Sequence, residues 1–178
     1  MLDGSNTLIF IGGIHGSGKT TIGKAAALRL GAEFRSCSQI IRFERQTQAV
    51  STPGVTEVDV NQLALITGLK RLRGLSITVI LDGHFTLITQ NDGIQNIPIS
   101  VFEAMLPDVL FLVETRPSSV CSRLASRDGV VTHEAEILGY QEHERQFASH
   151  VSRKIGRQLI VLNGDDDNAH LAVMRAVR

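Results

Sequence analysis

A glycine-rich segment that ends in a lysine and two threonines has the clearest chemical potential in this chain. Its spacing is that of a phosphate-binding loop, or P-loop. Glycine lets successive backbone N–H groups converge on a polyphosphate, the lysine reaches the β and γ phosphates, and the threonine hydroxyl ligates Mg²⁺. A glycine-rich turn arising by chance is the alternative, but the segment lies between a strand-like and a helix-like run, as the motif requires. The predicted nucleotide-binding residues are Gly13, His15, Gly16, Ser17, Gly18, Lys19, Thr20 and Thr21.

A second polar position follows the apolar run from Ile77 to Leu81, where Asp82 precedes a glycine. A carboxylate at the carboxyl end of a buried strand beside a P-loop holds Mg²⁺ in P-loop proteins. The other interpretation is an aspartate that caps a turn. We therefore predict Thr20 and Asp82 as the metal-binding residues. His84 lies at the same strand end and faces the predicted site, whereas the spacing of the other histidines does not favour zinc.

Arginines form a third candidate group. Arg123 and Arg127 are four residues apart on a predicted helix, so they share one face and precede a short glycine-containing loop. Arginine suits phosphoryl transfer because its charged, planar fork binds two oxygens at once. Arg145 lies beyond that loop on the longest predicted helix. A solvated basic face is the alternative for all three residues.

The elements that must position these residues alternate between strand-like and helix-like runs. Near-continuous apolar strands are typical of a parallel sheet covered on both faces, so the pattern predicts a three-layer α/β fold. The predicted strands are 8–11, 32–35, 77–81, 109–113 and 159–162. The predicted helices are 20–30, 38–49, 59–73, 100–105, 117–126, 134–155 and 168–177. In the longest of them, Glu144 interrupts the apolar stripe. Loops are expected at 52–54, 90–98 and 128–129.

Composition limits the function classes. The chain has 178 residues, 43% of them hydrophobic, which suits one compact domain over residues 1–178. Its 18 basic residues balance 18 acidic ones, which argues against general nucleic-acid binding. Two cysteines give neither a disulfide framework nor a four-ligand zinc site, which favours the cytoplasm. No signal peptide is recognised, and no run approaches the about 20 apolar residues of a membrane helix.

These residues resemble the P-loop nucleoside monophosphate kinases, specifically the archaeal-type adenylate kinase branch. The P-loop, the segment Ser38-Gln39-Ile40-Ile41-Arg42 and the segment Leu81-Asp82-Gly83-His84 carry the resemblance, together with the run from Leu106 to Thr115. It implies a five-stranded parallel sheet in the order 2-3-1-4-5. It also implies acceptor-binding helices at about 38–73 and a short lid at about 127–133. The implied roles are acceptor binding for Arg42, Gln62 and His84, and catalysis for Lys19, Arg123, Arg127 and Arg145.

The resemblance implies Mg-ATP-dependent transfer of a phosphoryl group to a nucleoside monophosphate, with AMP as the leading acceptor. The implied cofactors are ATP and Mg²⁺, and the implied partners are small-molecule nucleotides. Assembly into a homo-oligomer is possible under this prediction. This chain has Asp82-Gly83-His84-Phe85-Thr86 where many adenylate kinases carry an arginine that clamps the acceptor phosphate. A kinase for another small metabolite and a regulatory ATPase are therefore the alternatives. A GTPase is disfavoured because Asn163-Gly164-Asp165 lacks the lysine of the usual guanine-reading motif.

Overall fold

Five parallel strands form the central sheet of the computed structural model, which describes residues 7–47, 57–73, 77–89 and 93–177. Along the sheet the order is β2-β3-β1-β6-β7. When only the five strands of this sheet are numbered along the chain, the order is 2-3-1-4-5, so the predicted order is confirmed. The strands are β1 (Leu8–Gly12), β2 (Glu33–Ser36), β3 (Val79–Asp82), β6 (Val109–Glu114) and β7 (Leu159–Asn163).

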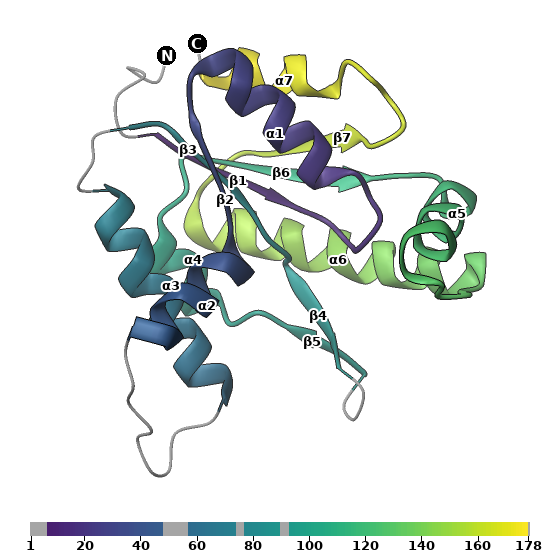
Figure 1. The fold of residues 1–178 in the computed structure, drawn as a ribbon, viewed down its shortest axis with the longest axis horizontal. Coiled ribbons are helices and arrows are strands. Elements are labelled where there is room, and N and C mark those ends of the chain that lie inside the picture. Colours follow the sequence, from purple (N-terminus) through teal and green to yellow (C-terminus); the bar gives the residue numbers. More distant parts are fainter. Residues whose placement is uncertain (1–6, 48–56, 74–76, 90–92, 178) are drawn as a thin grey trace.

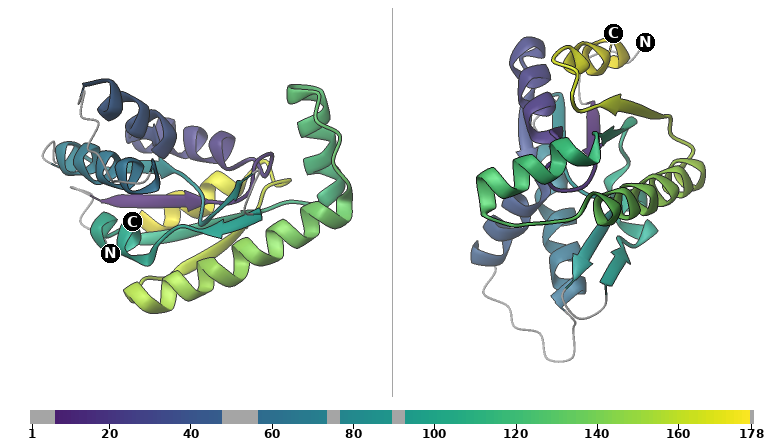
Figure 2. Two further views of the ribbon diagram at one scale, coloured as in Figure 1. Left: turned by 90° about the horizontal axis from the view of Figure 1, so that it is seen from below. Right: turned by 90° about the vertical axis from the view of Figure 1, so that its right-hand side faces the viewer.

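Helices cover both faces of this sheet, which confirms the predicted three layers (Figures 1 and 2). On one face lie α1 (Lys19–Leu30) and α7 (Ala169–Val177). The opposite face carries α4 (Ile99–Met105) and the long α6 (Glu134–Ile155), together with the pair α2 (Cys37–Thr47) and α3 (Glu57–Arg73). The helix α5 (Pro117–Asp128) projects beside the end of the sheet where the P-loop lies (Figure 2).

Side chains alternate along each strand between two hydrophobic cores. Ile9 and Ile11 pack toward α1 and α7, whereas Leu8 and Phe10 pack toward α4 and α6. In the second core, Phe10 lies edge-on to Phe85, with 5.1 Å between the ring centroids. Because interiors are packed as densely as organic crystals, this aromatic contact gives the turn after β3 a rigid base.

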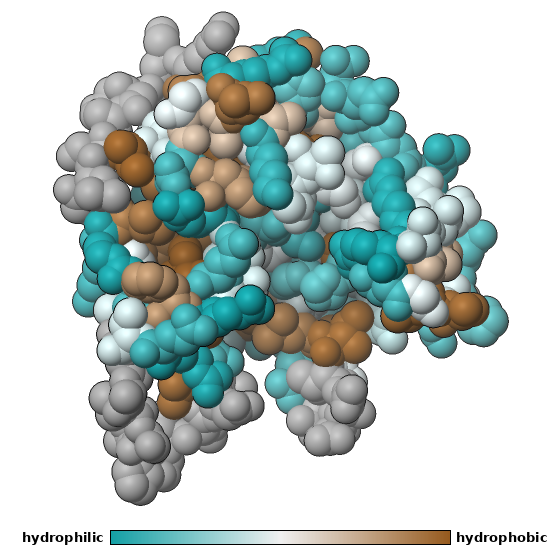
Figure 3. Space-filling model, viewed as in Figure 1, coloured by the Kyte–Doolittle hydropathy of each residue, from teal (hydrophilic) through white to brown (hydrophobic). Residues whose placement is uncertain are grey.

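The segment after β3 departs from the prediction. Residues 90–98 were expected to form a loop, but β4 (Thr86–Thr89) and β5 (Gly93–Asn96) pair as an antiparallel hairpin outside the main sheet. Both strands have only four residues, too few for a clear alternating pattern. Apolar surface is visible over this hairpin (Figure 3), where Leu87 and Ile88 are 43% and 53% exposed.

The ends of the helices agree with the prediction to within two residues, and those of the longest helix agree fully. Gln48, Ala49 and the loop predicted at 52–54 lie outside the described residues. The change that matters is in α5, which continues to Asp128. Gly129 then ends the helix with φ 68°, a left-handed conformation that glycine adopts without strain. The coil of the predicted lid therefore spans residues 129–133, and Arg127 lies in the last turn of α5. No helix in the described ranges is long and apolar enough to cross a bilayer.

Candidate active site

The P-loop connects β1 to α1 and turns through backbone conformations that need glycine. Gly18, directly before α1, has φ 94°. Gly13 has φ 146°, and a Cβ there would lie 2.7 Å from the Val113 carbonyl oxygen. The chain can therefore wrap closely around the start of α1, where unpaired helix N–H groups favour an anion. Thr20 and Thr21 follow in the first turn of α1, and both are exposed.

A chain of buried hydrogen bonds connects this loop to the end of β6 and to α6. The Thr115 hydroxyl donates to the Ser17 carbonyl oxygen over 2.6 Å. Gln141 of α6 then bonds both backbone groups of Thr115, accepting from its N–H and donating to its C=O, each over 2.9 Å. The Ser17 hydroxyl oxygen is buried without a hydrogen-bond partner among the described residues. Sequence reasoning missed Gln141 because its partner lies 26 residues away along the chain.

Lys19 lies inside the curl of the loop and is only 6% exposed. Its ammonium donates to the Ile14 carbonyl oxygen over 3.2 Å. Burial lowers the pKa of Lys19, while the charges of Asp82 and Glu144 act in the opposite direction. Because this buried ammonium has one backbone carbonyl oxygen as its hydrogen-bond acceptor, it can bind the oxygens of an anion such as a phosphate more strongly.

Thr20 and Asp82 meet as predicted. Parallel pairing of β1 with β3 places Asp82 beside Ile11, just before the P-loop. The Thr20 hydroxyl donates to Asp82 Oδ2 over 2.5 Å, and Asp82 is 7% exposed. A hydroxyl and a carboxylate oxygen are ligands that suit Mg²⁺, which usually keeps several waters and phosphate oxygens as its other ligands. The pair therefore fits Mg²⁺ bound with a nucleotide, and no group of three or more His, Cys, Asp or Glu residues among the described ones could hold a metal alone.

The turn after Asp82 is fixed by a carboxylate that sequence reasoning did not assign to the site. Glu144 of α6 accepts hydrogen bonds from Phe85 N (2.9 Å), Thr86 N (2.7 Å) and the Thr86 hydroxyl. Glu144 is 1% exposed, and burial raises its pKa while these hydrogen bonds act in the opposite direction. The available signal was the polar residue that interrupts the apolar stripe of the longest helix.

Two histidines lie together at the mouth of the P-loop. The rings of His15 and His84 are 4.5 Å apart between centroids and inclined by 48°. Burial is the main cause that lowers the pKa of His84, to about 2, and the nearby charges of Lys19 and His15 add to it. Burial also lowers the pKa of His15, followed by Lys19 and Arg127. Both rings are therefore neutral at neutral pH and offer an uncharged surface beside the loop.

The paired arginines of α5 have different surroundings. Arg123 donates to the carbonyl oxygens of Gly16 (3.0 Å) and Gly164 (3.2 Å), and to Asp165 Oδ1 (2.9 Å). It therefore ties the P-loop to the segment after β7. Arg127 is exposed and pairs with its neighbour Asp128. Its charge lowers the pKa of Lys19, so its field reaches the phosphate site.

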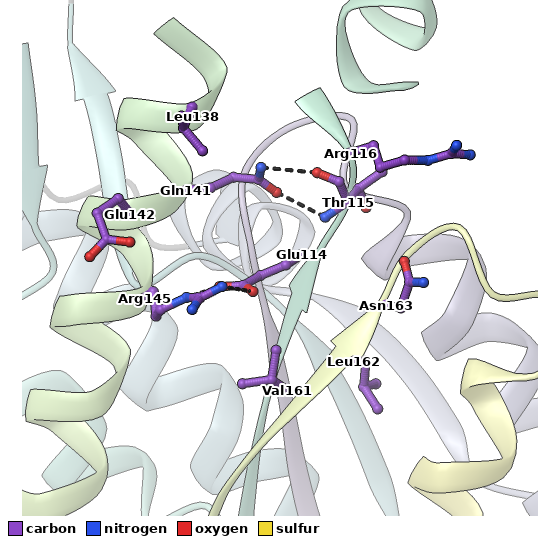
Figure 4. Close-up of a pocket in the computed structure, with 10 residues that line it drawn as sticks. All are labelled: Glu114, Thr115, Arg116, Leu138, Gln141, Glu142, Arg145, Val161, Leu162 and Asn163. Carbon is purple, nitrogen blue, oxygen red and sulfur yellow. Dashed lines mark hydrogen bonds and ion pairs between the residues drawn. The ribbon is translucent and has the colours of Figure 1, made fainter. Parts of the chain in front are cut away.

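Arg145 lies elsewhere. Its guanidinium forms an ion pair with Glu114 in a surface depression of about 460 Å³ between α6 and β7 (Figure 4). No P-loop residue lines that depression. The structure does not bring Arg145 together with Lys19 in this arrangement, and its catalytic role stays a prediction.

A cavity of about 470 Å³ extends from the P-loop toward α2, α3 and the hairpin. Its P-loop end is lined by His15, Lys19, Thr20, Asp82 and His84. Apolar walls follow, formed by Phe10, Ile41, Leu65, Ile97, Pro98, Val101, Phe102 and Met105. Neutral polar side chains also line it: Ser36, Ser38, Asn61, Gln62, Gln95 and Asn96. Cys37, Gly83 and Leu87 complete the lining.

Gln62 lines this cavity, as expected of an acceptor-binding residue, but Arg42 does not. Arg42 is exposed and follows the lining residue Ser38 by about one turn of α2, which places both on one side of the helix. Among the described residues, no arginine lines the cavity. The cavity therefore offers apolar contact and uncharged hydrogen-bonding groups away from the P-loop.

Solved structures share this fold at low sequence identity. A gluconokinase from Sinorhizobium meliloti aligns over 97% of this chain and 89% of its own, with TM-score 0.55 and 13% identity. The protein TT1252 from Thermus thermophilus aligns over 96% and 95%, with TM-score 0.55 and 16% identity. These similarities confirm the P-loop kinase fold.

Curated relatives confirm the resemblance to archaeal adenylate kinases. The adenylate kinase of Thermococcus sibiricus is 29% identical, over 96% of this chain and 93% of its own. That of Pyrococcus horikoshii is 23% identical over the same shares. The sequence family described as "AAA domain" matches residues 12–137, more than two thirds of the chain. The chain therefore belongs to this AAA domain family, as a P-loop kinase domain.

Proposed function

We propose that the chain transfers the γ-phosphoryl group of Mg-ATP to a nucleoside monophosphate, with AMP as the leading acceptor. The observation that carries the proposal is the single cavity that joins Lys19, Thr20 and Asp82 to an apolar chamber with amide side chains. Apolar walls suit a planar heterocyclic base, and the amides of Asn61, Gln62 and Gln95 can donate to and accept from its edge. A sugar acid would gain little from such walls. The names of the archaeal relatives point in the same direction.

The reaction needs no covalent enzyme intermediate. An oxygen of the acceptor phosphate attacks the γ-phosphorus, the bond from that phosphorus to the β–γ bridging oxygen breaks, and ADP leaves with the bond's electron pair. Thr20 and Asp82 would hold Mg²⁺, which would neutralise charge on the nucleotide phosphates. Lys19 exchanges the Ile14 carbonyl oxygen for phosphate oxygens. Arg127, in the last turn of α5 directly before the lid coil, neutralises charge that develops on the transferred group.

Several contacts prepare this chemistry before substrate arrives. Gln141 and Thr115 hold the P-loop, and Glu144 holds the turn that carries Asp82 and His84. Positioned groups accelerate a reaction because their ordering cost has been met during folding. The neutral ring of His84 lines the cavity beside the transferred group, which suits binding of the acceptor without an extra charge.

The test is ADP formation from ATP with AMP, CMP, UMP, GMP and a sugar acid as separate acceptors, and with none. AMP should raise ATP consumption at least about tenfold, because an oriented phosphate replaces randomly placed water. Arg42→Ala should raise the KM for AMP through loss of a contact worth about 1.5 to 3 kcal/mol, while acceptor-free hydrolysis stays unchanged. Arg29→Ala is the matched control, because Arg29 is an exposed arginine of α1 on the other face of the sheet.

The absence of arginine from the described cavity lining favours one second candidate, a kinase for an uncharged small metabolite. Stimulation by a hydroxyl compound with no response to any monophosphate would select it. ATP hydrolysis at one slow rate with every acceptor would instead indicate a regulatory ATPase.

A further inference from the structure

The strand β7 forms one edge of the sheet, and no described segment pairs with its outer side. Exposed sheet edges in natural proteins are usually protected by lysine, proline or a bulge, because their free N–H and C=O groups can pair with another chain. From Leu159 to Asn163 this strand has no charge and no proline. Val161, at its centre, is 52% exposed. The edge is therefore an apolar, unprotected pairing surface.

The backbone direction along β7 is fixed by its pairing with β6. Gln158 O accepts from Leu110 N, and Gly164 N donates to Glu114 O. In a parallel pair alternate residues of a strand direct both backbone groups to the same neighbour. Even-numbered residues of β7 therefore face β6, and Leu159, Val161 and Asn163 direct their N–H and C=O groups outward.

Charges flank the strand with opposite sign at its two ends. Before it come Arg153, Lys154 and Arg157, which are exposed and form no ion pair among the described residues. After it come Asp165, Asp166 and Asp167, of which the last two are exposed. Antiparallel pairing of two such strands places each basic end beside the acidic end of the other copy. Pairing of two copies is therefore favoured by charge as well as by the backbone.

Symmetry restricts the register of that pairing. A twofold axis perpendicular to the sheet keeps each side chain on its own side of the sheet. Residues that stand opposite each other must therefore face the same side, and one residue at the centre stands opposite its own copy, with the axis between the two. With the axis at Val161, Leu159 lies opposite Asn163. Arg157 lies opposite Asp165, which already pairs with Arg116 and Arg123 within its own copy. The exposed Asp167 lies on the diagonal, within reach of the long Arg157 side chain. The outward-facing backbone groups of Val161 then bond to their own copies.

The surfaces beside the edge are also apolar. On the α6 side, Leu138 and Val161 border the depression in Figure 4, and Leu138 is 60% exposed. On the α7 side, Leu171 and Ala172 line a second depression that also includes Val161. A second sheet that continues from β7 would cover apolar surface on both faces, which stabilises association.

We propose that two copies of this chain associate through antiparallel pairing of their β7 strands, centred on Val161, so that their two sheets become one. No residue of β7 lines the cavity, so each copy keeps its own cavity. The P-loop is joined through Arg123 to Gly164, directly after β7, and Gly164 lies outside the paired strand. The proposal does not depend on the identity of the acceptor.

Sedimentation equilibrium of the full chain over about 1 to about 100 μM tests it, a range that covers association of ordinary strength. A dimer is expected, and Val161→Lys should raise the dissociation constant at least about tenfold, because it places two like charges opposite each other. Leu28→Lys is the matched control, since Leu28 is an 86% exposed residue of α1. Circular dichroism establishes that both variants are folded. A monomer at all concentrations, or an equal effect of both variants, would overturn the proposal.

The register has its own test. Arg157→Glu should weaken the dimer, and addition of Asp167→Arg should restore part of the affinity, because the exchanged charges meet again across the axis. Val161→Cys should give a disulfide-linked dimer on mild oxidation, since paired residues place their Cα atoms within disulfide range. Leu28→Cys should give none. A dimer that neither crosslinks at position 161 nor responds to the charge exchange would refute pairing through β7.

Discussion

Replacement of Glu144 by glutamine perturbs the turn that carries Asp82 and His84 while it preserves side-chain volume. The carboxylate accepts from two backbone N–H groups and one hydroxyl. A glutamine side chain has one acceptor oxygen, so its amide N–H₂ must face one of these donors. A buried donor left without a partner costs about 1 to 3 kcal/mol. We expect Glu144→Gln to lower the free energy of unfolding by that amount.

The cost should also depend on pH with a definite sign. Because burial raises the pKa of Glu144 in the folded protein, the wild type gains stability from this group below the ordinary pKa of a glutamate. That gain disappears as the pH rises through the raised, folded-state pKa. Glutamine does not titrate. The difference between wild type and Glu144→Gln should therefore be largest in acid and smaller at neutral pH.

Urea unfolding followed by circular dichroism at a series of pH values measures this difference. The matched control is Gln146→Ala on the same helix, which is exposed, bonds only to Glu142 and should change stability by less than about 0.5 kcal/mol. In the kinase assay, Glu144→Gln should lower turnover in the folded variant, since the turn beside the transferred phosphate is less well fixed. Equal stability of wild type and variant, or a difference that grows toward neutral pH, would refute the reasoning.

The remaining predictions concern the phosphate site. Lys19→Ala should lower phosphotransfer at least about a hundredfold, or about 2.7 kcal/mol, in single-turnover assays, and unchanged turnover in a folded variant would contradict its role. Asp82→Asn should raise the Mg²⁺ concentration needed for half activity, whereas an unmoved titration curve would leave Asp82 as a turn cap. Arg123→Ala should lower both thermal stability and turnover, because the bond from Arg123 to the P-loop and its two bonds to the segment after β7 are lost. Arg127→Ala should cost more turnover than Arg145→Ala, since Arg145 is paired with Glu114; the reverse order would restore Arg145 as the primary catalytic arginine.

The parts of the site that the sequence predicts well are those set by local spacing. Gly13 to Thr20 form the expected loop because glycine, lysine and hydroxyl positions are fixed relative to one another. Asp82 meets Thr20 because parallel strands bring their carboxyl ends to one edge of the sheet. The order of the strands followed from the resemblance rather than from the strands themselves, since their apolar runs are alike on both faces.

The parts that were missed depend on contacts between distant segments. Glu144 and Thr86 are 58 residues apart, and nothing in their local sequence indicates that one accepts from the other. The hairpin was overlooked because its strands are short and its turn residues are typical of a loop. For Arg145 the sequence predicts a place in the site that the side-chain contacts do not support. Its position along the helix is compatible with the site, but its side chain pairs with Glu114.

The helix α6 contacts both segments that face the predicted phosphate site. Its 22 residues make a rod about 33 Å long. It begins directly after the lid coil, and Gln141 and Glu144, three residues apart, hold the P-loop through Thr115 and the turn after Asp82. Any rotation or shift of this rod displaces both contacts at once. Movement of the predicted lid at one end of α6 would therefore change the alignment of both phosphate-facing segments, so substitutions in residues 129–133 should alter catalysis as well as access to the site.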